Sequence, residues 1–440
     1  MPFVFANRFY YLLIAGILPL GFVSAVPAIG YAVLLYDFCL TAFAIYDYRK
    51  SRHRIQRLLA ERTFDERFAI GSPSTVRIAV ENLNNVRATI ELKDEIPPEM
   101  ELEGSREATI PLASMARAEF TYRLRPPRRG EFHFGKIAVR LLSDFRLVMI
   151  DGSLATPEVI KVYPNIRRAR QMEQKSLGSR SFLAVKRRAE QRGEGRDFES
   201  LRDYVRGDEL RHISWPATAR RSKLTTRQFQ IERDQTVIIA LDAGRLMTGR
   251  IDGETKFDAA VHSALALMSA AQKAGDNCGL LVFCRRVLRF VPPKRAGAAI
   301  DSVIEALCTV EPELIEPSYP RALQFIASNV KRRSCVVILT DLVDQDSSRD
   351  LIRSLRLLRP RHLPLVVTIG DRDLKSLVAE RPASIRDVFR QSAAEEIIFQ
   401  REAALRKIES FGGLAIDVTT ATLAPRLIDE YLKVKERGRL

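Results

Sequence analysis

The chain has 440 residues, of which 46% are apolar and 28% charged, and its formal net charge is +16. This length exceeds one ordinary hydrophobic core, so we expect two or three domains, and the composition excludes an intrinsically disordered chain. The five cysteines are odd in number and show no C-x-x-C spacing, which argues against a disulfide framework and against a zinc site.

The N-terminal segment, residues 9–46, is almost wholly apolar and is interrupted by Pro27 and Gly30. Each half is close to the ~20 residues that cross a bilayer as a helix, so we predict a transmembrane helical hairpin within residues 1–60. Basic residues flank the hairpin, and the positive-inside rule places both ends and the bulk of the chain in the cytoplasm. A signal peptide cleaved near Ala25 is the alternative.

One carboxylate, Asp37, lies within the second apolar half. A charge at the bilayer centre is costly, so this side chain should face the partner helix or be protonated. We interpret it as a helix-pairing hydrogen bond to a hydroxyl such as that of Ser24, with an ion or proton site as the alternative.

Residues 61–164 show a period of two. Runs such as Val76–Val80, Phe120–Leu124 and Ile137–Leu141 alternate apolar and other residues and are separated by Pro, Gly and Asn. This pattern predicts antiparallel strands, enough for two sheets, and favours a β-sandwich of immunoglobulin-like architecture.

Residues 165–235 form a predicted basic linker that leads into a dense charged motif. Between residues 161 and 233 lie 19 Lys or Arg and 9 Asp or Glu. This excess of positive charge creates a positive electrostatic field, which implies an anionic neighbour. Few aromatic residues are interleaved and no nucleic-acid motif is present, so we expect an anionic membrane surface or an acidic partner and no nucleic acid.

Residues 236–440 alternate apolar runs with helical periodicity, which predicts a doubly wound α/β sheet with helices on both faces. The run TVIIAL ends at Asp242 and the run CVVILT ends at Asp341, as buried parallel strands should. Because ligands bind beyond the carboxyl ends of such strands, the two carboxylates should meet at that edge.

The charged motif, residues 193–232, combines a G-x-G entry, an LRDY run, a Gly-Asp pair, R-x-I-x-W, an Ala-Arg pair and a closing Glu. It resembles the signature of the bacterial "domain of unknown function 58" family. The matching residues are Gly193, Gly195, Leu201 to Tyr204, Gly207, Asp208, Arg211, Ile213, Trp215, Ala219, Arg220 and Glu232.

The resemblance implies that residues 236–440 form a von Willebrand factor A-like domain. In that fold, an Asp-x-Ser-x-Ser loop, a distant Thr and a second Asp hold a hard cation such as magnesium. Here the loop Asp242-Ala243-Gly244-Arg245-Leu246 lacks both hydroxyls, Arg245 opposes a divalent ion, and Ser318 is the one replacement for the Thr. We therefore expect a degenerate site of Asp242, Ser318 and Asp341 that binds magnesium weakly or not at all, and no other cofactor.

The signature also supplies the predicted partner-binding residues, which are Arg202, Asp203, Gly207, Asp208, Arg211, Trp215 and Arg220. A structural interpretation competes with this one, because Asp–Arg pairs form clamps and a tryptophan is commonly a buried anchor. We predict no catalytic residues, since the sequence has no P-loop, no G-x-S-x-G and no metal-spaced histidines.

The resemblance further implies an association with AAA-type ATPases of the MoxR class. We expect a non-enzymatic protein of the bacterial inner membrane, facing the cytoplasm, that acts as adaptor or partner of such an ATPase in assembling or activating other complexes. The alternatives are a magnesium-dependent enzyme using Asp242 and Asp341, and a basic lipid- or polyanion-binding scaffold.

Overall fold

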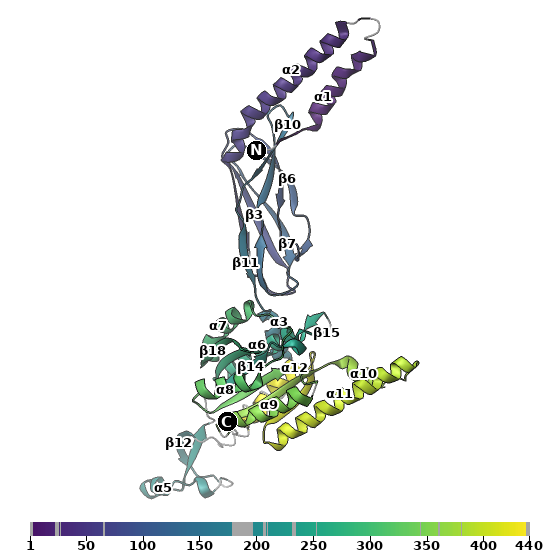
Figure 1. Cartoon of the computed structure of the whole chain (residues 1–440). Helices are drawn as coiled ribbons and strands as arrows, with labels where there is room; N and C mark the ends of the chain where they lie inside the picture. Colours follow the sequence, from purple (N-terminus) through teal and green to yellow (C-terminus); the bar gives the residue numbers. More distant parts are fainter. Residues whose placement is uncertain are drawn as a thin grey trace. The chain divides into compact units, whose positions relative to one another are not determined.

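The computed structural model (Figure 1) describes residues 3–436 apart from 23–25, 27, 65–66, 178–196, 206–207, 209, 231–234, 252, 344, 360 and 380. The chain divides into two compact units, Met1–Tyr163 and Pro164–Leu440. The first unit contains both the apolar N-terminal segment and the strand-rich segment.

The apolar segment forms α1 (Asn7–Ile17), a short 3-10 helix (Leu18–Phe22) and α2 (Ala28–Ser51), followed by a second 3-10 helix (Arg52–Arg57). In the described part of the chain, one helix, Ala28–Arg57, is long and apolar enough to cross a membrane. The helices α1 and α2 contact each other, and the Tyr36 hydroxyl donates to the Leu12 carbonyl at 3.0 Å. Gly16 permits this contact, because a Cβ there would collide with the Tyr36 ring.

Two antiparallel sheets make up the rest of the first unit. One has the order β2-β3-β7-β5, the other β1-β10-β9-β4-β6, and β11 pairs with β8 separately. The strands are β1 (Phe3–Phe5), β2 (Leu58–Phe64), β3 (Ser74–Asn82), β4 (Ala88–Asp94), β5 (Glu101–Glu103), β6 (Glu107–Leu112), β7 (Arg117–Arg125), β8 (Gly130–Phe134), β9 (Ile137–Leu142), β10 (Val148–Ser153) and β11 (Glu158–Val162).

Both sheets contribute to one hydrophobic core. Ile78 and Leu124 of the first sheet and Ile90 and Leu141 of the second belong to the same buried cluster. The strands alternate buried and exposed residues, as β4 does over its whole length. The period-two runs therefore form a β-sandwich, and the strands predicted from them are confirmed.

The apolar helices are joined to this sandwich at both ends. Before α1, strand β1 pairs with β10. At the end of α2, the buried Asp47 carboxylate accepts from the Ser143 hydroxyl at 2.5 Å, from the Ser51 hydroxyl and from the Phe145 amide. The start of α1 and the end of α2 therefore lie at the same end of the sandwich.

The second unit is built on a six-stranded sheet of order β18-β17-β14-β19-β20-β21. Its strands are β14 (Thr236–Asp242), β17 (Asn277–Phe283), β18 (Val287–Arg295), β19 (Ser334–Thr340), β20 (Leu363–Gly370) and β21 (Leu414–Thr419). All neighbours pair in parallel except β18, which is antiparallel to β17. The chain enters at β14, proceeds to β18 and then returns to the other side through β19.

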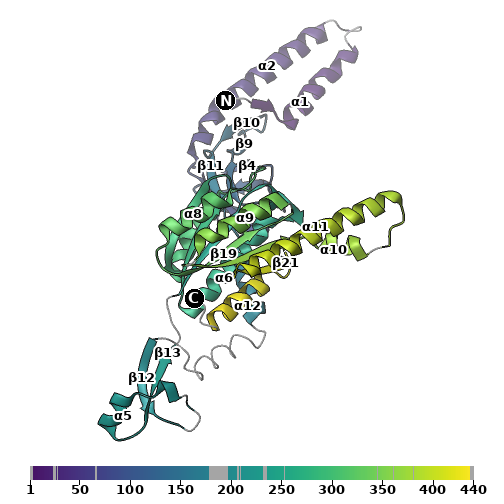
Figure 2. The ribbon, with the colours of Figure 1, turned by 60° about the horizontal axis from the view of Figure 1, so that its bottom comes forward.

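Helices cover both faces of this sheet, as predicted. Residues of α8 (Tyr319–Asn329), α9 (Gln345–Leu358) and α11 (Ile385–Ser410) share one buried cluster with the strands, and Figure 2 shows α8 and α9 in front of the sheet. The other helices are α3 (Ile166–Leu177), α6 (Lys256–Ala274), α7 (Ala296–Cys308), α10 (Arg372–Ala379) and α12 (Leu423–Glu436). Of these, α3, α7 and α12 all contact α6.

The signature residues form a small element of their own. Strand β12 (Asp197–Asp203) pairs antiparallel with β13 (Thr225–Gln230). A 3-10 turn (Leu210–His212) and the short helix α5 (Trp215–Arg221) lie between the two strands in sequence. We call this element the signature hairpin.

Candidate functional site

The carboxyl edge of the sheet brings Asp242 next to Asp341, because β14 and β19 are parallel neighbours. Asp242 is 1% exposed and accepts hydrogen bonds from the Thr340 hydroxyl at 2.6 Å, the Gly244 amide at 2.7 Å and the Tyr319 hydroxyl at 3.4 Å. Burial raises the pKa of Asp242 to about 6, although these donors oppose the change. The chain itself thus supplies three donors to this carboxylate.

Asp341 is neutralised by two cationic side chains. Its Oδ2 lies 2.6 Å from Lys256 Nζ and its Oδ1 lies 2.5 Å from an Arg401 guanidinium nitrogen. Arg401 also donates through Nε to the Leu342 carbonyl at 3.0 Å. Since Asp341 is 1% exposed, both ion pairs lie in a poorly hydrated environment where an unpaired charge would be costly.

Lys256 reaches this edge from the first residue of α6. Its amide donates to the Gly249 carbonyl at 2.8 Å, and the preceding residue, Thr255, caps the helix by accepting from the Asp258 amide. A cation in the first turn of a helix is disfavoured by the helix dipole. The pair with Asp341 offsets that penalty.

These residues do not fit a bound magnesium ion. Lys256 and Arg401 already hold both oxygens of Asp341, and their charges repel a divalent cation. Gly244 replaces one expected hydroxyl, and a Cβ there would lie 2.8 Å from Pro317 Cδ. Thr340 and Tyr319, not Ser318, supply the hydroxyls that contact Asp242.

The signature hairpin contains one well-defined clamp. Arg202 pairs with Asp208 at 2.6 Å, and Asp208 also accepts from the Val205 amide at 3.0 Å. The Val205 amide and the Arg202 guanidinium hold the pKa of Asp208 below its usual value. Asp203 and Arg220 are exposed. Gly207 and the side chain of Arg211 lie outside the described residues.

The expectation that Trp215 is a buried anchor is wrong, because its side chain is 66% exposed. The neighbouring Ile213 is buried instead, and the Ser214 amide donates to the Thr225 carbonyl at 2.9 Å. A seven-residue helix on a two-stranded sheet offers too little surface to bury an indole. Other exposed apolar side chains of this element are Val205, Leu210 and Leu224.

Sequence reasoning therefore brought Asp242 and Asp341 together but missed their partners. Lys256, Thr340, Tyr319 and Arg401 were not predicted site residues. One signal was available for Lys256, since a lysine directly after a capping threonine lies at the unfavourable end of a helix.

Comparison with known proteins identifies the signature region. Residues 200–407 match the family described as "Protein of unknown function DUF58". The chain is 25% identical over 223 residues to the uncharacterized protein Rv1480 of Mycobacterium tuberculosis and to the uncharacterized protein Mb1516 of Mycobacterium bovis. These alignments cover 49% of this chain and 66% of each relative, so the chain spans just under two thirds of their length.

Among solved structures, the chain is similar to the conserved hypothetical protein BatB from Bacteroides thetaiotaomicron. The identity is 13% and the TM-score is 0.30, over 46% of this chain and 99% of that one.

Proposed function

This chain belongs to the DUF58 family over residues 200–407, and from that premise we propose that it is a membrane-anchored, cytoplasmic protein-interaction module without a catalytic centre. The observation that carries the proposal is the exposure of Trp215 in the middle of the signature. Tryptophan is enriched among the residues that dominate binding energy at interfaces. The partner implied by the family resemblance is an AAA-type ATPase of the MoxR class, which this chain would serve as adaptor.

The surface around Trp215 favours an acidic partner. Arg220, Arg221, Lys223 and Arg227 are all exposed on α5 or close to it in sequence. A basic patch around an aromatic anchor steers an acidic surface into contact and then buries apolar area.

The topology of the second unit supports a von Willebrand factor A-like assignment. Five parallel strands carry one antiparallel edge strand, and helices cover both faces. Asp242 ends β14 and Asp341 directly follows the adjacent strand β19, where the order of connection reverses. Ligand sites of doubly wound sheets lie at such points.

The carboxyl edge favours binding over chemistry. The Asp341 carboxylate is held by Lys256 and Arg401, and the Asp242 carboxylate by hydroxyl and amide donors. Neither carboxylate is placed as an open metal ligand or as an accessible base. The edge therefore acts as a preformed binding surface with a fixed shape. A magnesium-dependent enzyme is our second hypothesis for the function of this chain.

The contacts at the ends of the apolar helices support a two-helix membrane hairpin at the inner membrane. Strand β1 precedes α1 and pairs with the sandwich, so cleavage near Ala25 would remove a strand of the sheet. The basic residues Arg49, Lys50, Arg52 and Arg54 follow or end α2, which favours a cytoplasmic location for the sandwich. The anionic lipid headgroups of the membrane are thus a second binding partner that we propose for this chain.

The proposal is tested by affinity capture of the full chain from detergent-solubilised membranes, with and without ATP. The wild type should recover an AAA-type ATPase in a nucleotide-dependent manner. Trp215→Ala should reduce the recovery at least about tenfold, because truncating a central aromatic anchor typically costs about 2 kcal/mol or more.

The matched control is Phe399→Ala, since Phe399 is 62% exposed on α11 and lies outside the signature hairpin. Its recovery of the ATPase should equal that of the wild type. The proposal fails when the wild type recovers no ATPase under either condition, or when Trp215→Ala recovers as much as the wild type.

A further inference from the structure

Three turns of the β-sandwich lie beside the end of the apolar segment. They connect β3 to β4, β6 to β7 and β9 to β10, and we call them the proximal turns: residues 83–87, 113–116 and 143–147. The Asn84 side-chain amide donates to the Arg54 carbonyl at 3.1 Å, and the Arg54 guanidinium donates to the Asp144 carboxylate at 2.6 Å. The Met115 amide donates to the Asn84 carbonyl at 3.3 Å. All three turns are therefore connected to one another around Arg54, shortly after α2.

The turn at residues 143–147 lies where the apolar part of α2 ends. Its Ser143 hydroxyl donates to Asp47 at 2.5 Å, and Asp47 lies just before the basic last turn of that helix. The ring of Phe145 contacts the ring of Phe43 on α2, with centroids 4.9 Å apart. In a helix that spans a bilayer, the level at which apolar residues give way to basic ones is the headgroup region.

Each proximal turn presents an apolar side chain to solvent. Val86 is 47% exposed, Met115 is 63% exposed and Phe145 is 39% exposed. A turn that only reverses the chain is commonly built from Gly, Asn, Asp or Pro. Three apolar tips at one end of one domain are more than a single scattered residue, and they indicate a surface that something apolar covers.

Two of these turns hold non-glycine residues in the left-handed backbone region. The φ angle is 54° at Met115 and 59° at Arg146. Residues with a Cβ atom are uncommon in this region, where Gly or Asn is accommodated more easily. The presence of an apolar and a cationic side chain at these strained positions therefore indicates a role beyond reversing the chain.

The same end of the sandwich carries an excess of positive charge. Residues 47–57 and the proximal turns together contain seven Arg or Lys and two Asp. Of the two carboxylates, Asp47 is buried and Asp144 forms ion pairs with two neighbouring cations. The charge of this end therefore favours an anionic partner.

Arginines extend this charge onto the turns themselves. Arg87 and Arg146 are exposed, and each is next to an apolar tip in the sequence. The exposed carboxylates of the adjoining strands, Glu81 and Glu91, lie opposite arginines on neighbouring strands. The tips of the turns thus combine apolar side chains with cations.

We propose that the proximal turns bind the surface of an anionic phospholipid bilayer. The side chains of Val86, Met115 and Phe145 enter the headgroup layer, where they gain contact with the acyl chains. Arg87 and Arg146 contact lipid phosphates, because guanidinium groups pair well with phosphate oxygens. This inference rests on the membrane anchoring proposed above and identifies the surface of the sandwich that meets the lipid.

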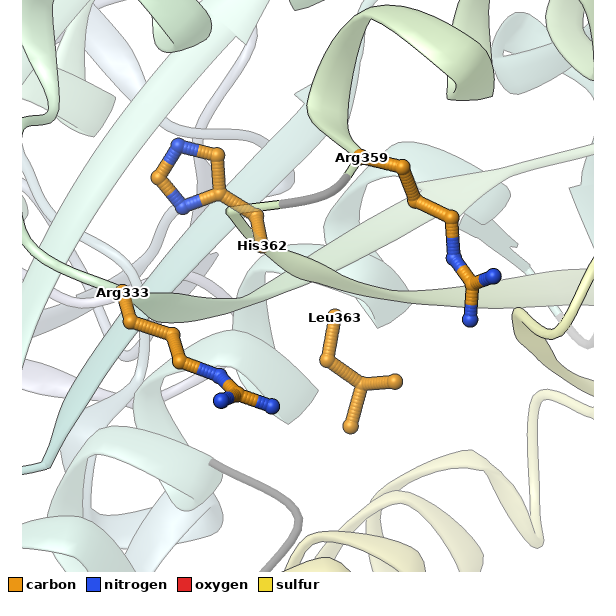
Figure 3. A pocket seen from close by; sticks show the side chains of 4 residues that line it. All are labelled: Arg333, Arg359, His362 and Leu363. Carbon is orange, nitrogen blue, oxygen red and sulfur yellow. The ribbon is translucent and has the colours of Figure 1, made fainter.

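Cations alone would not select a bilayer. The second unit also has a basic cavity, of about 560 Å³, which Figure 3 shows with its lining residues Arg333, Arg359, His362 and Leu363. Most of these side chains are polar, so this basic surface lacks the projecting apolar side chains that enter a bilayer. The proximal turns have both features.

An acidic protein is the other candidate partner for an apolar and basic surface. The proximal turns, however, adjoin exposed apolar side chains of α2 such as Phe43 and Tyr46. A bilayer that α2 spans covers those side chains in any case. The lipid surface is thus the partner that is continuous with the anchor.

The test uses the full chain with Cys39→Ser, reconstituted into vesicles. The other four cysteines are buried, so a single introduced thiol can carry an environment-sensitive bimane probe. Met115→Cys reports on an apolar tip. Leu102→Cys is the matched control, because Leu102 is 36% exposed and pairs with Leu124 toward the other end of β7. The vesicles contain phosphatidylcholine and phosphatidylglycerol in equal parts, or phosphatidylcholine alone.

We expect the emission of the Met115 probe to shift to shorter wavelength in the anionic vesicles and to be quenched by lipids that carry a nitroxide near the headgroup. The Leu102 probe should show neither effect. The double variant Arg87→Glu and Arg146→Glu should abolish the shift of the Met115 probe, because the reversed charges are repelled by the anionic lipid.

A second double variant controls for net charge. Arg123 and Lys136 are exposed cations near the other end of β7 and between β8 and β9. The variant Arg123→Glu and Lys136→Glu makes the same change of net charge and should leave the shift of the Met115 probe intact.

A Met115 probe that behaves like the Leu102 probe, or that responds equally in both kinds of vesicle, would overturn the proposal. A shift that survives the reversal of Arg87 and Arg146 would overturn it as well. Alkaline carbonate treatment of the same vesicles separates this result from a failure of the anchor. An extracted chain would contradict the anchor and this contact together, whereas a retained chain with an unshifted probe would contradict this contact alone.

Discussion

At the scale of single residues, the carboxyl edge of the sheet is defined by the buried ion pairs of Asp341. Lys256 and Arg401 lie 2.6 Å and 2.5 Å from its two oxygens. A buried ion pair contributes little net stability when complete, but removal of Lys256 would leave the buried Asp341 carboxylate with Arg401 as its remaining ion-pair partner. The contribution of Lys256 to the free energy of unfolding is therefore best measured by replacing it.

Lys256→Met should lower the free energy of unfolding of the second unit by about 1–3 kcal/mol, because Oδ2 of Asp341 loses its partner while Arg401 still holds Oδ1. The rate at which the buried thiols Cys278 and Cys335 are labelled in detergent reports this opening. Lys433→Met is the matched control, because Lys433 pairs with Glu430 at the surface and should contribute roughly 0–1 kcal/mol. Equal labelling of the two variants would contradict the account.

Asp242 should make stability depend on pH. Its folded-state pKa of about 6 lies above that of the unfolded chain, so at pH values between the two pKa values the folded state binds more protons. The stabilising contribution of the protonated carboxyl is therefore complete below about pH 4 and is lost as the pH rises through 6. Each unit of difference between the folded and unfolded pKa values corresponds to about 1.4 kcal/mol of unfolding free energy. Asp242→Asn should remove this slope, as measured by urea unfolding followed by circular dichroism between pH 4 and 7. A wild-type slope that persists in the variant would assign the pH dependence to other groups.

The neighbours Asp242 and Asp341 could be predicted from the sequence, but the cationic partners of Asp341 could not. Asp242 and Asp341 were predictable neighbours because each terminates an apolar strand. Lys256 and Arg401 reach Asp341 across 85 and 60 residues, and no local pattern encodes such tertiary contacts. Trp215 was expected to be buried because of its residue type, but its side chain is 66% exposed.

At the scale of elements, the apolar helices and the sandwich are joined at both ends of the apolar segment. Strand β1 pairs with β10 before α1 begins, and Asp47 at the end of α2 binds Ser143 of the sandwich. Both ends of the apolar segment are thus held by one domain.

This arrangement predicts the membrane topology. In a Cys39→Ser chain, Val4→Cys should react with a membrane-impermeant maleimide only from the cytoplasmic side, and Val26→Cys only from the opposite side. Val4 and Val26 are both exposed, which makes them comparable positions. Absence of residue 4 from the mature chain would instead support signal-peptide cleavage.

The elements that follow a strong period were predictable. The run Val76–Val80 lies in β3, and the runs before Asp242 and Asp341 form β14 and β19. Strand β1 was not, because three apolar residues ahead of an apolar helix carry no alternation. The helix α1 ends at Ile17, earlier than predicted, and a 3-10 helix containing Pro19 follows.

At the scale of the whole molecule, the chain combines a predicted anchor, a β-sandwich and an α/β unit whose surfaces suit protein contacts. The signature hairpin presents Trp215, and Lys256 and Arg401 occupy the carboxyl edge through their ion pairs with Asp341. The sequence predicted the succession of fold types from changes of period. It could not predict the ion pairs at the carboxyl edge, which join residues that meet only in the folded sheet.

The central claim is that the chain's own cations close the carboxyl edge, so this edge binds proteins and no divalent metal. Calorimetric titration of magnesium, and then manganese, into the full chain tests it most directly. We predict no binding in the micromolar range for the wild type or for Asp242→Ala. A micromolar site in the wild type that Asp242→Ala abolishes would contradict the account.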